Sequence, residues 1–198
     1  MSFFSLLLGF LPWIVFLIIA GHHSLAQLKI AILVSFVLNI IGGITKYQRG
    51  VIMWAGLAFF AFDTVAVVIF ENMWVVSHMA VLASGTLFVA AFVTMLAGHP
   101  FVFAYARDGV DKKYWNSPRF LRTCYLITSV WCAVFLLNTL TNFFRIYHRE
   151  IPSWIYEAAE NTFLVSGALF TTLYVKHVKK KSAAMHKEDE TPPEASHS

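Results

Sequence analysis

Six long apolar stretches, separated by short polar or glycine-containing breaks, dominate the pattern of the chain. Each is long enough to cross a hydrocarbon core of about 30 Å as a helix. None alternates apolar and polar positions as a strand of a membrane barrel does. Because backbone polar groups inside a bilayer must be satisfied within their own segment, we expect helices. The expected spans are residues 3–20, 25–44, 51–70, 75–97, 123–144 and 154–175.

Composition points to the same class of protein. Hydrophobic residues make up 58% of the 198 residues and charged residues only 13%, about half of the roughly 25% in a soluble domain. Such a chain cannot cover a soluble fold with charged side chains, and it is too apolar to be disordered. The sequence therefore predicts an all-α, polytopic membrane helix bundle.

The basic residues predict how the bundle is oriented. All of the 15 Lys and Arg residues except Lys29, Arg145 and Arg149 fall in the second-to-third connection, the fourth-to-fifth connection or the C-terminal tail. The positive-inside rule then gives six transmembrane helices with both termini in the cytoplasm. Because the orientation in the membrane accounts for these basic residues, the net charge of +4 does not indicate a nucleic acid, and we expect no nucleic-acid partner. We expect a transmembrane domain over residues 1–181 and a polar, disordered cytoplasmic tail over residues 182–198.

The connection between the fourth and fifth spans mixes aromatic and basic side chains. Ser117 and Pro118 predict a helix start, with Ser at the N-cap and Pro at the first helical position. The mixture before it suits the headgroup layer of a bilayer. It is either a docking surface for a cytoplasmic partner or lipid, or a simple interfacial loop. The interfacial or partner-binding candidates are Tyr105, Arg107, Lys112, Lys113, Tyr114 and Trp115.

A few polar residues within the spans are candidates for binding a ligand or a proton. Asp63 lies in the middle of the third span, where a carboxylate is costly unless it is neutral, paired or solvated. It is either a proton or cation site, or a protonated group bonded to a neighbouring helix.

Glu157, Glu160 and Asn161 share one face of the sixth span. They line an outward-facing polar cavity shared with Asp63, or they pack against Arg145 or Arg149. Asn138, on the fifth span, completes the set of candidates.

Histidines at the ends of spans raise the question of haem. A membrane cytochrome needs axial histidine pairs from facing helices, and the candidate ligands are His22, His23, His78 and His99. They flank the spans instead of lying within them, and no covalent haem motif is present. We therefore expect no cofactor and no metal site. Motifs of hydrolases and nucleotide-binding enzymes are also absent, so we assign no catalytic residue and favour a protein that is not an enzyme.

Several short aromatic motifs resemble a known family. They are Phe10–Pro12 with Phe16, Gly98–Phe101, Trp115, Trp131–Phe135, and Asn138 or Asn142. Together they resemble the intracellular septation protein A family of bacterial inner-membrane proteins, over about residues 9–178. The resemblance implies a role in envelope maintenance or cell division through contacts with other membrane proteins, and it supplies no catalytic residues. The family is described with fewer than six spans, and the segment 103–122 departs from its type members.

Two classes of function follow. The first is a non-enzymatic protein of the bacterial inner membrane that binds lipids or other membrane proteins, including further copies of itself, in cell-envelope biogenesis or division. The second is a small transporter or membrane substrate-binding subunit with a polar site around Asp63 and Glu160. A third alternative, a membrane cytochrome, is tested by an absorption spectrum.

Overall fold

The computed structural model describes residues 8–20, 24–45, 47–48, 50–107, 110–148 and 150–189, with side chains as far as residue 180. All the regular elements in these ranges are helical. In chain order they are α2 (Leu11–Ala20), α3 (Leu25–Ile44), α4 (Val51–Asp63), the π-helix η1 (Thr64–Ile69), α5 (Met73–Leu96), α6 (Val102–Ala106), the 3-10 helix η3 (Lys112–Tyr114), α7 (Pro118–Tyr147) and α8 (Ser153–Asp189).

Four helical segments in the described ranges are long and apolar enough to cross a membrane. They are Leu25–Ile44, Val51–Ile69, Met73–Leu96 and Pro118–Tyr147. Many large apolar side chains on them are exposed, which is costly in water but suits contact with lipid. These segments indicate an integral membrane protein.

The expected count of six spans needs correction. α2 has ten residues, or about 15 Å of rise, half the thickness of a hydrocarbon core. α8 is long enough, with 37 residues, but Glu157, Glu160 and Asn161 make its first half too polar to join the four candidates. The cytoplasmic location of the termini stays a prediction.

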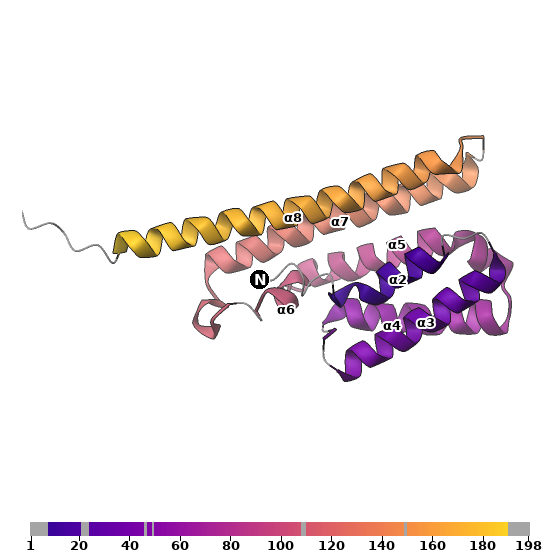
Figure 1. Cartoon of the computed structure of the whole chain (residues 1–198), viewed down its shortest axis with the longest axis horizontal. Helices are drawn as coiled ribbons and strands as arrows, with labels where there is room; N and C mark the ends of the chain where they lie inside the picture. Colours follow the sequence, from indigo (N-terminus) through magenta and orange to yellow (C-terminus); the bar gives the residue numbers. More distant parts are fainter. Residues whose placement is uncertain are drawn as a thin grey trace, which may run out of the picture.

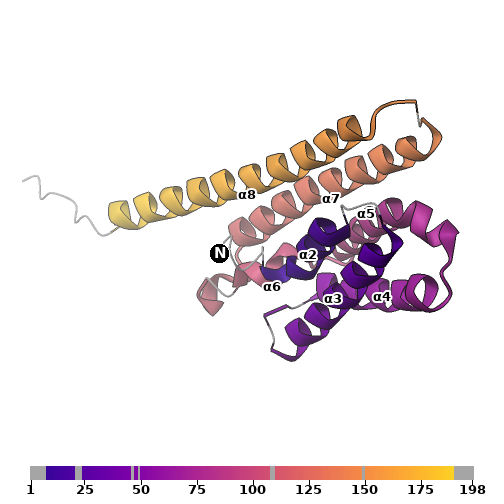
Figure 2. The ribbon, with the colours of Figure 1, turned by 45° about the vertical axis from the view of Figure 1, so that its right-hand side comes forward.

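The long helices run back and forth along one direction (Figure 1). α2 packs on α3, α3 on α4, α4 on α5, α5 on α7, and α7 on α8. The turn after α3, α6 and the last turns of α8 lie at one end of the bundle, and the α7–α8 turn lies at the other (Figures 1 and 2). Figure 2 shows α8 lying along α7 and away from α3 and α4.

Polar side chains cap the helices at the positions where the apolar runs begin. Ser24 accepts a hydrogen bond from the Gln27 amide at the start of α3, and Asn72 accepts bonds from two amides at the start of α5. Ser117 accepts a bond of 3.3 Å from the Phe120 amide, with Pro118 in the first turn of α7. The predicted helix start at Ser117 and Pro118 is therefore confirmed.

Aromatic side chains hold the short helix α2 inside the bundle. The rings of Trp13 and Phe59 stack with centroids 5.1 Å apart, and Phe10 stacks on Trp131 at 5.8 Å. The side chain of Asn39 packs directly against the backbone at Gly56 of α4, so a Cβ added at Gly56 would collide with the Asn39 side-chain amide. Phe10 and α2 together therefore link α7 and α4, and the buried side chains of α2 form part of the cavity wall described below.

Two departures from the expected elements lie at helix ends. The third span changes from α-helix to π-helix directly after Asp63. α8 continues to Asp189, into the segment that we expected to be a disordered tail, and residues 190–198 lie outside the described ranges.

Candidate functional site

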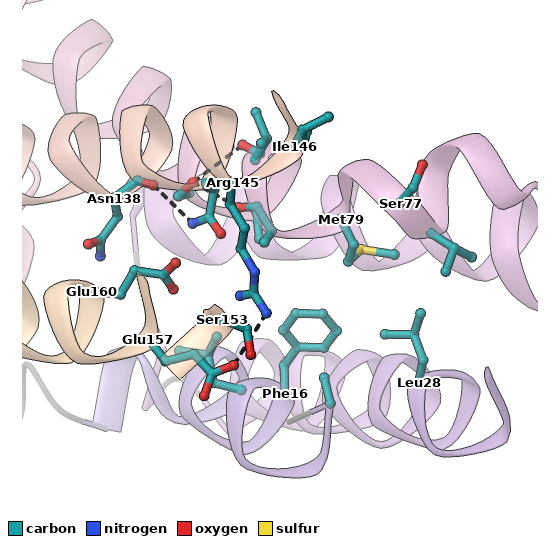
Figure 3. Close-up of a pocket in the computed structure, with 18 of the residues that line it drawn as sticks. Phe16, Leu28, Ser77, Met79, Asn138, Arg145, Ile146, Ser153, Glu157 and Glu160 are labelled. Atoms are coloured by element: carbon teal, nitrogen blue, oxygen red, sulfur yellow. Dashed lines mark hydrogen bonds and ion pairs between the residues drawn. The ribbon is translucent and has the colours of Figure 1, made fainter. Parts of the chain in front are cut away.

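A cavity of about 940 Å³ lies between α2, the start of α3, α5, α7 and the first half of α8. It is near the end of the bundle that carries the α7–α8 turn. Figure 3 shows Glu157 and Glu160 reaching from α8 toward Arg145 and Asn138 on α7, with Phe16, Leu28 and Met79 beyond them. The cavity thus has one polar end and one apolar wall.

The polar end follows from the register of α7 against α8. Arg145 forms an ion pair of 3.3 Å with Glu157. Deeper in the bundle, the indole nitrogen of Trp131 donates a buried hydrogen bond of 3.1 Å to the Thr171 hydroxyl. The helices are antiparallel, and both pairs fit one and the same alignment of α7 against α8. Moving three residues along each helix from the Arg145–Glu157 pair leads to Asn142 and Glu160, which therefore lie level with each other about one turn deeper in the bundle.

Among the residues that the structure describes, several buried oxygen atoms at this end lack hydrogen-bond partners. Asn138 and Asn142 are only 6% and 4% exposed. The side-chain nitrogen of Asn142 donates to the main-chain carbonyl of Asn138 at 2.9 Å. The side-chain oxygen of Asn142 takes no part in this bond. Among the described residues, the side-chain oxygens of both asparagines and Oε1 of Glu160 are buried with no hydrogen-bond partner. Buried acceptors of this kind are costly unless a bound water or ligand satisfies them.

The opposite wall is mostly apolar, with Ser24, Ser77 and Ser84 among its members, and it comes from elements distant in sequence. The side chains that form it include Trp13, Phe16, Leu17, Leu25, Leu28, Val76, Met79, Leu87, Phe135 and Leu164. Sequence reasoning did not find this wall, because nothing local in the chain indicates that α2 faces α8 across a gap.

The rim carries a further carboxylate that is already engaged. Glu150 is exposed, and its side chain lies 3.0 Å from Nδ1 of His148. Its own backbone amide, together with His148, lowers the pKa of Glu150. Glu150 is therefore ionised at neutral pH and held by the turn between α7 and α8.

The structure brings four of the five ligand or proton candidates together and leaves one apart. Asn138, Glu157, Glu160 and Asn161 line the cavity, whereas Asp63 does not. Asp63 is fully buried at the end of α4, and neither of its carboxylate oxygens has a hydrogen-bond partner among the described residues. The expected sharing of one cavity between Asp63 and Glu160 is not what the structure has.

The aromatic and basic candidates occupy the other end of the bundle. Arg107 lies over the ring of Trp115 at 5.8 Å, and Lys113 over that of Tyr114 at 4.8 Å. Lys112 is exposed beside them. Tyr105 differs from the rest, because it is 2% exposed and belongs to the interior of the bundle.

The two histidine candidates that the structure describes do not meet. His78 and His99 lie near opposite ends of α5, about 30 Å apart along the helix axis, so they cannot hold the same haem. His78 bonds to the Trp74 carbonyl, and His99 to the Ala97 carbonyl. His22 and His23 lie outside the described residues. Within the ranges that the structure describes, no three His, Cys, Asp or Glu side chains gather as a metal site.

No family model, curated protein or solved structure matches the chain. The resemblance to the septation protein A family therefore stays a prediction. What the chain binds has to be argued from the cavity itself.

Proposed function

We propose that the chain is a non-enzymatic membrane protein that binds an amphiphilic, lipid-like molecule in the cavity between α2, α5, α7 and α8. The observation that carries this proposal is the division of the cavity into a polar end and an apolar wall. Its volume of about 940 Å³ lies within the range of roughly 300–1,000 Å³ in which ligand pockets fall.

An alkyl chain is the natural occupant of the apolar wall. Each methylene group that leaves water contributes about 0.8 kcal/mol, so a chain lying along Phe16, Leu28 and Met79 binds without any directional contact. The polar end then fixes the position of the headgroup. A wholly apolar ligand leaves the oxygens of Asn138 and Asn142 without donors, and a wholly polar ligand makes no apolar contacts with the wall.

The cellular setting that we propose is cell-envelope biogenesis or division in a bacterial inner membrane. This part rests on the motif resemblance and on the basic residues around α6 and η3. With that end toward the cytoplasm, the cavity lies in the outer half of the membrane.

A transporter is the second candidate, since an amphiphile held between helices can also be moved across the bilayer. The observation that favours it is the position of the cavity among long apolar helices. Binding comes first in either case, so a binding experiment tests both.

The test uses protein held in a non-ionic amphipol and a pyrene-labelled fatty alcohol as the neutral probe. Ala80 lines the cavity, and Ala80→Trp places an indole where the alkyl chain would lie. We expect this change to weaken probe binding at least tenfold, about the effect of losing 1.4 kcal/mol.

Ala133→Trp is the matched control. Ala133 is exposed on α7 and does not line the cavity, so the same substitution there should leave probe binding as in the wild type. Equal binding by the wild type and both variants would show that the probe does not use the cavity, and the proposed function would be wrong.

A further inference from the structure

We infer that the polar end of the cavity recognises a primary ammonium headgroup, as in a long-chain amine or an aminophospholipid. This inference rests on the proposed function and names the class of ligand. The residues that carry it are Glu160, Asn142 and Asn138.

Among the described residues, the buried partnerless atoms at this polar end are acceptors, whereas a partnerless donor, Nε1 of Trp13, lies on the apolar wall. The acceptors are the side-chain oxygens of Asn138 and Asn142 and Oε1 of Glu160. The oxygen of a side-chain amide and the oxygens of an ionised carboxylate accept hydrogen bonds and do not donate them. Oxygens need N–H or O–H groups from the ligand, and an ammonium group supplies three donors at a single point.

The charges around the cavity favour a cation in the same place. Among the lining residues that the structure describes, Arg145 is the single Lys or Arg side chain, facing Glu150, Glu157 and Glu160. Arg145 is paired with Glu157, and Glu150 bonds to His148. Among the described residues Glu160 forms no direct ion pair, and Arg145 attracts it only from further away, so a cation at its Oε1 improves the balance of charge.

The register of the two helices places these acceptors within about one helical turn of each other. Asn142 and Glu160 lie level with each other across the α7–α8 contact, and Asn138 lies one turn deeper on α7. The side-chain nitrogen of Asn142 donates to the main-chain carbonyl of Asn138 and also interacts with the Glu160 carboxylate, so the side-chain oxygen of Asn142 is the atom available to a ligand. A quaternary ammonium group lacks N–H donors and does not satisfy these oxygens.

The experiment compares headgroups on one alkyl chain. Dodecylamine, dodecanol, dodecyltrimethylammonium and dodecanoate each compete with the pyrene-labelled fatty alcohol for the wild-type protein. We expect dodecylamine to displace the probe at a concentration about tenfold or more below that of dodecanol, the effect of hydrogen bonds to a charged group. Dodecyltrimethylammonium should fall near dodecanol, and dodecanoate should be the weakest competitor.

Variants then place the preference on Glu160. Glu160→Gln should bring dodecylamine to the level of dodecanol, whereas the probe itself still binds. Glu150→Gln removes the same charge from the rim and should keep the preference within about twofold, because an exposed charge contributes little. If Glu160→Gln does not fold, Asn142→Leu removes a neighbouring acceptor and should reduce the preference several-fold.

The outcomes separate this inference from the proposed function. Probe binding with equal displacement by the amine and the alcohol would overturn the ammonium assignment and leave the cavity function standing. An amine preference that both glutamate variants lose equally would reduce it to general charge attraction, which also overturns the assignment. Failure of the wild type to bind the probe would overturn the function itself.

Discussion

The indole nitrogen of Trp131 and the hydroxyl of Thr171 form a buried hydrogen bond that joins α7 to α8. The same hydroxyl donates to the Gly167 carbonyl within α8, so the Thr171 side chain is fixed before it meets the indole. This contact sets the register that places Glu160 beside Asn142.

Replacing Thr171 with valine should destabilise the protein. The change keeps the shape of the side chain but leaves the buried indole N–H without an acceptor, which costs about 1–3 kcal/mol. Unfolding by titration with a denaturing detergent measures the loss. Thr172→Val is the control, because Thr172 is exposed and its hydroxyl bonds to the Ala168 carbonyl of its own helix. Equal loss in the two variants would contradict a role for the bond between helices.

Gly56 should not tolerate a side chain. A Cβ there meets the Asn39 amide and lies 3.2 Å from the indole nitrogen of Trp13, and overpacking of a buried contact costs about 1–3 kcal/mol. Gly85 is the comparison, since its Cβ would lie an ordinary 3.8 Å from Thr139. Gly85→Ala should be neutral or stabilising by up to about 1 kcal/mol through helix propensity. Thermal unfolding of the two alanine variants in the same detergent should therefore give opposite shifts.

Asp63 should be dispensable for ligand binding. Asp63→Asn removes a carboxylate that is buried with no partner in the described part of the chain and that does not line the cavity. We expect the fatty-alcohol probe to bind as it does to the wild type, and the stability to stay the same or rise by up to about 2 kcal/mol, since an intramembrane carboxylate is costly. Loss of probe binding in a folded Asp63→Asn protein would link Asp63 to the cavity after all.

Lys29 and Glu71 form an ion pair between α3 and the turn before α5, which should make stability depend on acid. The hydrogen bond from Lys29, with the positive charge of that side chain, lowers the pKa of Glu71. A carboxylate with a lowered pKa stabilises the folded state above the ordinary value of about 4.3, and this contribution is lost as the pH falls below it. Melting temperatures of the wild type and Glu71→Gln should converge in acid and differ at neutral pH. A constant difference across this range would contradict the assignment.

The aromatic and basic segment around α6 and η3 should attract anionic lipid. Each Lys or Arg near a negative surface contributes about 1 kcal/mol, so reversing Arg107, Lys112 and Lys113 to Glu should remove most co-purified phosphatidylglycerol, measured by mass spectrometry of extracted lipid. The same reversal at Lys176, Lys179 and Lys180 is the comparison, because these lysines form a basic stretch on a regular helix. An unchanged lipid content after the first reversal would contradict the role of this segment.

The sequence predicted individual helices well where an apolar run has a cap at its start. α3 spans the expected residues 25–44, and α7 begins at the expected proline. The two ends of the chain were predicted less well. α2 is too short to cross the membrane by itself, and α8 is longer and more polar than a simple span.

The candidate site was predicted in its residues but not in its grouping. Helical spacing alone placed Glu157, Glu160 and Asn161 on one face. Whether Asp63 or Asn142 lies opposite that face depends on which helix packs against α8, and packing partners leave no periodic signal along the chain. The carboxylates Asp63 and Glu160 look alike in sequence, because each interrupts an apolar run. In the structure they differ, because each is surrounded by different residues.

The π-helix after Asp63 gives the third span a place where its length can change. A π-helix closes its hydrogen bonds one residue later than an α-helix, so η1 contains a residue that an uninterrupted α-helix does not need. Deleting one residue from most of a packed span rotates everything beyond it by about 100° and turns buried faces toward lipid. Deleting one within Thr64–Ile69 lets the α-helical ladder close with the flanking faces near their present orientation. Natural variants of this chain that differ in length inside the membrane should therefore differ here.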